Sequence, residues 1–192
     1  MGLGLYIHVP FCEGKCQYCA FYSLAPKAET VYKYVERTLE LMAWYGADCA
    51  REVGTVYFGG GTPSIIGAER LERLLEGAKR YFHLVRDAEI TCEANPTGVS
   101  EGFFRQLYAA GFNRLSMGMQ SANTEELRLL GRKHGPEGVR QAVEGARTAG
   151  FKNISLDLML ALPGSTIESL ERSISFAAGL FPEHISAYSL MI

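Results

Sequence analysis

The chain of 192 residues lacks the sequence features that are typical of membrane-spanning, nucleic-acid-binding and secreted proteins. No apolar run approaches the roughly 18–20 residues that a membrane-spanning helix needs. There is no dense basic run, and the formal net charge is −2, which argues against nucleic acid as the main partner. The first residues carry no basic segment ahead of an apolar stretch, so a secretory signal is not expected. These absences predict a cytoplasmic protein with no nucleic acid partner and no membrane contact visible in the sequence.

A fourth cysteine is missing from a group of three, at Cys12, Cys16 and Cys19, which has the spacing C-x3-C-x2-C. Five cysteines in a chain without an export signal indicate metal or redox chemistry and not a disulfide framework. A closed zinc site uses four ligands, and an ordinary four-iron cluster uses four cysteines. The three thiolates therefore predict a cluster with one iron open to a substrate or cofactor. Two alternatives remain: a zinc site completed by His8, and three buried thiols.

The rest of the composition is ordinary, with 47% hydrophobic and 21% charged residues, and the length suits one globular domain over residues 1–192. Short apolar runs predict strands, and longer amphipathic stretches between them predict helices. The predicted strands are Leu3–Val9, Thr55–Phe58, Ala88–Cys92, Arg114–Met119, Ile154–Leu160 and His184–Met191. Strands that alternate with helices predict an α/β fold with a parallel sheet.

Helix signals lie between these strands. Thr30–Trp44, Glu69–Phe82 and Pro136–Ala149 have apolar positions near the helical period, and Gly150 closes the last of them. Asn123 with Glu126, and Ser165 with Glu168, predict two capping boxes.

The unusual residues follow the predicted strands. The cysteine loop follows the first strand, and a glycine stretch, Gly59–Gly61 with Thr62 and Pro63, follows the second. Glu93 and Gln120 come directly after the third and fourth strands, and Asp157 lies within the fifth. Functional loops of parallel α/β folds gather at the carboxyl ends of the strands, so one site on one face is expected.

The glycine stretch has no Cβ atoms, so its backbone can approach a ligand closely and offer N–H groups. A plain tight turn at the strand end is the alternative. No Gly-Lys-Ser/Thr follows, so the segment is not a P-loop.

Together the cysteine loop and the glycine stretch resemble the radical S-adenosylmethionine (radical SAM) superfamily. The resemblance implies that Cys12, Cys16 and Cys19 bind a [4Fe–4S] cluster whose open iron is chelated by the amino and carboxylate groups of S-adenosylmethionine (SAM). It also implies that an electron from the reduced cluster cleaves the sulfonium to give a 5′-deoxyadenosyl radical, with a reduced ferredoxin- or flavodoxin-type electron donor. The implied fold is a partial (β/α)6 TIM-like open barrel, the radical SAM core, which ends after its sixth strand.

Further segments resemble the oxygen-independent coproporphyrinogen III oxidase family and extend over nearly the whole chain. They are Tyr6–Cys12, Tyr57–Ser64, Glu93–Pro96, Arg114–Ser121, Leu130–His134 and Leu156–Met159. Carried over from the family, the residues expected to contact SAM are Tyr6, Gly60, Gly61, Thr62, Glu93, Gln120, Arg132 and Asp157. Tyr18 is expected to pack over the cluster or the adenine. Cys92 is expected to be a small buried residue and His134 a surface histidine; no catalytic residue is assigned.

Phe21 separates two branches of this family. The true oxidase, which decarboxylates propionates of coproporphyrinogen III, has a fourth cysteine at this position. Phe21 matches the other branch, the oxidase-like heme chaperones, which bind heme and deliver it to target proteins. The resemblance therefore implies heme or a porphyrin as a ligand and a heme-receiving protein as a partner. Ala161 and Ser165 depart from the usual Gly and Gln.

Three functions follow for testing: a heme chaperone, a coproporphyrinogen III oxidase and a zinc-binding structural domain. The last predicted strand is apolar and has no helix after it. A buried strand seldom ends a complete domain without cover, so the chain is expected to be the first part of a longer protein.

Overall fold

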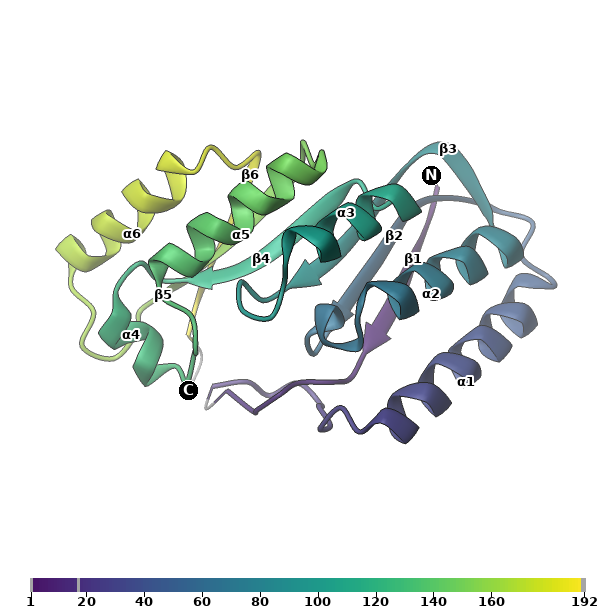
Figure 1. Ribbon diagram of the computed structural model, residues 1–192, viewed down its shortest axis with the longest axis horizontal. Coiled ribbons are helices and arrows are strands. Elements are labelled where there is room, and N and C mark those ends of the chain that lie inside the picture. The colour runs from purple at the N-terminus through teal and green to yellow at the C-terminus, as the bar shows by residue number, and fades with distance from the viewer. Residues whose placement is uncertain (1, 17, 191–192) are drawn as a thin grey trace.

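Six parallel strands form one sheet in the order in which they occur along the chain (Figure 1), in a computed structural model that describes residues 2–16 and 18–190. Each strand is paired in parallel with the next. The strands are β1 (Leu3–Val9), β2 (Glu52–Gly60), β3 (His83–Ala94), β4 (Arg114–Gln120), β5 (Ile154–Leu160) and β6 (His184–Ser189). The predicted α/β fold with a parallel sheet is confirmed.

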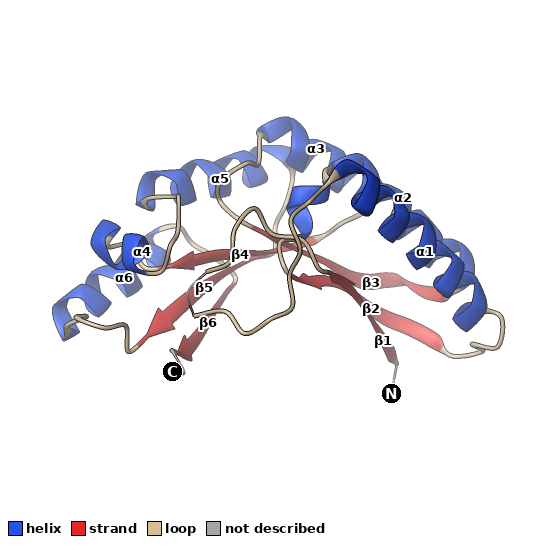
Figure 2. Cartoon of the chain, turned by 90° about the horizontal axis from the view of Figure 1, so that it is seen from below, coloured by secondary structure: helices blue, strands red, loops and turns tan. Residues whose placement is uncertain are grey.

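The helices all lie on one side of the curved sheet, and its concave side carries no helix among the described residues (Figure 2). This is the expected open (β/α)6 arrangement. The helices are α1 (Ala28–Gly46), a 3₁₀ helix η1 (Pro63–Ile66), α2 (Ala68–Tyr81), α3 (Glu101–Ala110), α4 (Thr124–Leu129), α5 (Pro136–Ala149) and α6 (Ile167–Gly179). In the described part of the chain, no helix is long and apolar enough to cross a membrane.

The capping predictions have mixed outcomes. Gly150 ends α5 in the left-handed conformation, at φ 112°, as expected. Both predicted capping boxes are wrong. Asn123 accepts from the N–H of Glu125, while Glu126 instead accepts a hydrogen bond from the Ser121 hydroxyl at 2.5 Å. At α6 the box forms one residue later than predicted, between Thr166 and Ser169.

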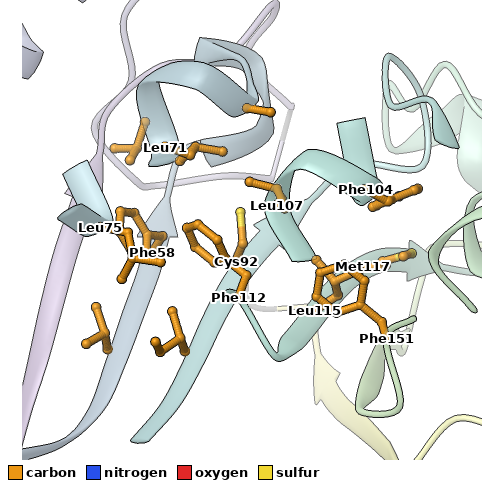
Figure 3. Packing of buried hydrophobic residues seen from close by; sticks show 14 of the residues in the cluster. Phe58, Leu71, Leu75, Cys92, Phe104, Leu107, Phe112, Leu115, Met117 and Phe151 are labelled. Atoms are coloured by element: carbon orange, nitrogen blue, oxygen red, sulfur yellow. The ribbon is translucent and has the colours of Figure 1, made fainter. Parts of the chain in front are cut away.

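The core lies between the sheet and the helices (Figure 3). Alternate strand residues point toward the helices, and Phe58 of β2 packs against Phe112 with ring centroids 5.0 Å apart. Cys92 of β3 is fully buried beside them, as expected. Burial of these side chains holds the strands in register and so fixes which residues face the concave side.

The concave side carries polar residues at the positions that alternate with the core. Tyr6 pairs in register with Tyr57, and Asp157 pairs with Ser186 of β6. β6 lies at one edge of the sheet, and five of its six residues are exposed. The predicted strand end, Met191, lies outside the described residues.

Candidate cofactor site

The cysteine loop leaves β1 and crosses the carboxyl end of β2. The Gly61 N–H donates to the carbonyl of Val9 at 2.9 Å, and the Thr62 N–H donates to the carbonyl of Phe11 at 2.7 Å. The two ends of the loop are hydrogen-bonded to each other, because the Cys12 N–H donates to the Leu24 carbonyl at 3.0 Å. Backbone hydrogen bonds therefore place the first cysteine directly over the glycine stretch.

Cys12, Cys16 and Cys19 are all partly buried, and none forms a disulfide. The loop turns between the last two, where the Cys19 N–H donates to the Cys16 carbonyl at 3.1 Å. Within residues 2–16 and 18–190, no three His, Cys, Asp or Glu side chains lie close enough to hold a metal ion. The three thiols are therefore close in sequence but are not drawn together at metal-binding distance, and the His8 Nδ1 lies 3.3 Å from the Tyr6 hydroxyl.

The glycine stretch is packed tightly against the end of β1 and the start of the cysteine loop. Gly60 has φ 112°, and a Cβ there would lie 2.5 Å from the His8 ring. A Cβ on Gly61 would lie 2.6 Å from the Phe11 carbonyl oxygen. The expectation that the stretch offers N–H groups is wrong for its last residues, because the N–H groups of Gly60, Gly61 and Thr62 all donate within the protein.

Glu93, at the end of β3, is held at both carboxylate oxygens. Oε1 accepts from the Tyr57 hydroxyl at 2.7 Å, and Oε2 accepts from the Gly60 N–H at 3.2 Å. Burial raises the pKa of Glu93, and these two hydrogen bonds oppose that rise. Tyr6 stacks on Tyr57, with ring centroids 6.0 Å apart and the planes inclined by 25°. Tyr6, Gly60 and Glu93 therefore lie together on the concave side.

Arg132, in the segment between α4 and α5, is hydrogen-bonded to Tyr18 of the cysteine loop and, through Asn95, to Thr62 beside the glycine stretch. One guanidinium nitrogen donates to Tyr18, which lies between two of the cysteines, at 2.6 Å. The other donates to the Asn95 side chain at 2.9 Å, and Asn95 donates in turn to Thr62 at 3.4 Å. The Arg132 Nε is buried and has no hydrogen-bond partner among the described residues. Burial raises the pKa of the Tyr18 hydroxyl to about 12, and the charge and hydrogen bond of Arg132 oppose that rise.

Gln120 and Asp157 lie on the neighbouring strands. Gln120 ends β4 with φ 67°, an unusual conformation for a residue other than glycine, and its Oε1 accepts from the Tyr188 hydroxyl at 2.6 Å. A Cβ on Gly118 would lie 2.9 Å from the Gln120 amide nitrogen and 3.6 Å from the Arg132 guanidinium. Asp157 accepts from the Ser116 hydroxyl at 3.3 Å, and burial raises the pKa of its carboxyl group.

The sequence did not identify the residues that hold these predicted contacts in place. Tyr57, Asn95, Ser116 and Tyr188 each hydrogen-bond to a predicted site residue. Strand alternation could have indicated Tyr57 and Ser116. Each lies an even number of residues from another residue of its own strand that faces the concave side. Nothing local in the sequence marks Asn95 or Tyr188, whose partners are far along the chain. His134, expected at the surface, is buried with its Nε2 3.1 Å from the Met119 carbonyl oxygen.

The sequence matches the radical SAM superfamily over residues 6–177. The chain belongs to that superfamily. Among solved structures, the fold matches that of coproporphyrinogen III oxidase (HemN) from Escherichia coli with a TM-score of 0.91 and 30% identity, covering 99% of this chain and 44% of that one. Methylornithine synthase (PylB), at 16% identity and a TM-score of 0.69, shares the fold.

Within the superfamily, the chain is similar to proteins named heme chaperone HemW. It is 41% identical to the one from Escherichia coli K12, over 99% of this chain and 51% of that protein. It is 39% identical to the one from Bacillus subtilis, over 97% of this chain and 50% of that protein. The predicted relationship to the heme chaperone branch is confirmed, and the chain spans about half the length of these curated relatives.

Proposed function

We propose that the protein is a heme chaperone that binds a [4Fe–4S] cluster and SAM, takes up heme and delivers it to a recipient protein. The observation that carries the proposal is the similarity to heme chaperones along 99% of the chain. Phe21, exposed on the cysteine loop where the oxidase branch has a fourth cysteine, supports the same branch. The chain would form one radical SAM core domain over residues 1–192.

Cys12, Cys16 and Cys19 would hold the cluster. Their donor set fits it, because thiolates are the ligands that iron–sulfur clusters take in proteins and all three thiols are free. Three ligands for four irons leave one iron for SAM, and when bound, the reduced cluster would supply the electron for reductive cleavage of the SAM sulfonium. A reduced ferredoxin- or flavodoxin-type protein would provide that electron.

The residues around the cysteine loop fit SAM. Among the described residues, the buried Nε of Arg132 has no partner and only two of its five N–H donors are used, so its guanidinium can bind the methionyl carboxylate. Glu93 is held facing the concave side, where its carboxylate can accept from the methionyl amino group. The glycine stretch would contact the same amino group through carbonyl oxygens, since its last N–H groups are already used.

The remaining contacts would recognise the nucleoside. Asp157 can accept from ribose hydroxyls. Gln120 can donate through the amide nitrogen that Tyr188 leaves free by bonding to the amide oxygen. Tyr6, stacked on Tyr57 and half exposed, would close the side of the site next to β1. Tyr18 would pack between the cluster and Arg132.

A second function, decarboxylation of coproporphyrinogen III, is favoured by one observation, the 0.91 TM-score to the oxidase structure. Two assays on the anaerobically reconstituted chain separate the functions. The first titrates heme and follows the Soret band, then measures heme transfer to an apo-hemoprotein acceptor such as apomyoglobin. The second adds coproporphyrinogen III, SAM and a low-potential reductant and measures loss of propionate groups.

Stable heme binding with transfer and without decarboxylation supports the chaperone. Turnover of coproporphyrinogen III without heme binding would support the oxidase instead. Metal analysis addresses the third function, because a colourless protein with one zinc per chain would contradict both radical SAM functions.

A further inference from the structure

The strongest unassigned feature is a row of hydrogen bonds that runs from Arg132 to Cys12. Arg132 donates to Asn95 at 2.9 Å, and Asn95 contacts the Thr62 hydroxyl at 3.4 Å. The Thr62 hydroxyl lies 3.6 Å from the Cys12 sulfur. The row joins four segments of the chain that are far apart in sequence.

The direction of every hydrogen bond in this row is determined by its two ends. A guanidinium group only donates, so the Asn95 oxygen must be the acceptor and its amide nitrogen must face Thr62. That nitrogen can only donate, so the Thr62 oxygen accepts from it. A cysteine thiolate bound to iron can only accept. The single hydroxyl proton of Thr62 is therefore available for donation to Cys12.

We propose that Thr62 donates a hydrogen bond to the Cys12 thiolate and that Asn95 is a positioning residue which, oriented by Arg132, fixes the direction of that bond and thereby raises the reduction potential of the cluster. The inference rests on the proposed cluster. A donor to a cluster sulfur stabilises the reduced form, which carries the additional negative charge, and so raises the potential. Arg132 is also the proposed contact for the SAM carboxylate, so the row connects that contact to a cluster ligand.

The readout is the midpoint potential of the cluster, measured by a reductive titration followed by electron paramagnetic resonance, on samples with about four irons per chain. Thr62→Val removes the hydroxyl and keeps the shape of the side chain. We expect about a tenfold lower ratio of reduced to oxidised cluster at a fixed applied potential, which is a fall of about 59 mV for one electron. Thr62→Ser keeps the hydroxyl and should restore the wild-type potential. Thr148→Val, on the exposed side of α5, is the matched control and should not shift it.

Asn95→Asp tests the positioning role. The carboxylate can accept from both Arg132 and Thr62, so the hydroxyl proton turns away from Cys12. The new negative charge also lowers the potential, and a double-mutant cycle separates the two effects. We expect Asn95→Asp to lower the potential more in the wild-type background than in the Thr62→Val background, where no hydroxyl remains to reorient.

A shift for Thr62→Val no larger than that for Thr148→Val would overturn the bond to Cys12. Equal shifts for Asn95→Asp in the two backgrounds would overturn the role of Asn95. Where Thr62→Val does not retain four irons, Thr62→Ala takes its place in the cycle. A wild-type chain that takes up no cluster would instead contradict the proposed function, so the two failures are distinguishable.

Discussion

Gly60→Ala tests whether the glycine stretch is needed for packing against β1. The new Cβ would lie 2.5 Å from the His8 ring, and the residue would have to keep φ 112°. Left-handed strain costs about 1–3 kcal/mol, and overpacking a filled site costs about another 1–3 kcal/mol. The substitution should therefore lower the free energy of unfolding by about 2–6 kcal/mol.

Gly164→Ala is the matched control, because Gly164 also has a positive φ of 77° but has no atom within 4 Å of its Cβ position. It should lose only the strain, the same about 1–3 kcal/mol. The difference of about 2 kcal/mol corresponds to a melting temperature about 4–8 °C lower for Gly60→Ala, measured by thermal unfolding followed by circular dichroism. His8→Ala combined with Gly60→Ala should recover the steric part. Equal losses for Gly60→Ala and Gly164→Ala would refute the packing argument.

Three further predictions use other parts of the structure. Tyr57→Phe removes a hydrogen bond that lowers the pKa of Glu93. Because the methionyl ammonium group needs the ionised carboxylate, the loss of SAM binding on the acid side should begin at a higher pH in this variant. Calorimetric titration of SAM at a series of pH values measures the shift, and an unchanged pH profile would exclude Glu93 as the titrating contact. Thr166→Ala should lower the free energy of unfolding in urea by about 1 kcal/mol, because Thr166 is the residue that caps α6. Ser165→Ala should lower it by less, and the reverse order would favour the capping box predicted from Ser165. Phe58→Ala, at a fully buried position in contact with Phe112, should cost about 3–5 kcal/mol in the same assay, and a loss below about 1 kcal/mol would mean that this core is loosely packed.

Local pattern was enough to predict the limits of the strands that are short apolar runs between turn or loop residues. β1 and β5 have the predicted limits, because each is a short apolar run whose neighbours are clear turn or loop residues. β3 is longer than predicted. Its first half, which includes Arg86 and Asp87, has no apolar run, so the sequence pattern did not mark it as a strand. That half extends the strand through pairing with β2, where Glu52 lies opposite His83. Tertiary pairing of this kind leaves no periodic signal in a single sequence.

The candidate site also has a part that the sequence predicted and a part that depends on contacts between distant segments. The spacing of the three cysteines and the family motifs predicted which residues lie at the carboxyl ends of the strands. The structure brings Arg132, Tyr18 and Thr62 into one hydrogen-bonded group around the cysteine loop. Asn95, which joins two of them, could not be predicted, because its role depends on partners 33 and 37 residues away. The internal use of the Gly61 N–H depends likewise on how the cysteine loop crosses β2.

The proposed function depends on a cluster held by Cys12, Cys16 and Cys19 with one iron open to SAM. The most direct test is the electron paramagnetic resonance spectrum of the anaerobically reconstituted, reduced chain, recorded with and without SAM alongside iron analysis. We expect about four irons per chain, a reduced-cluster signal that changes when SAM is added, and loss of the iron and of the signal in the variant with all three cysteines replaced by alanine. A fully loaded cluster whose signal SAM leaves unchanged, or a chain that binds zinc and no iron, would contradict it.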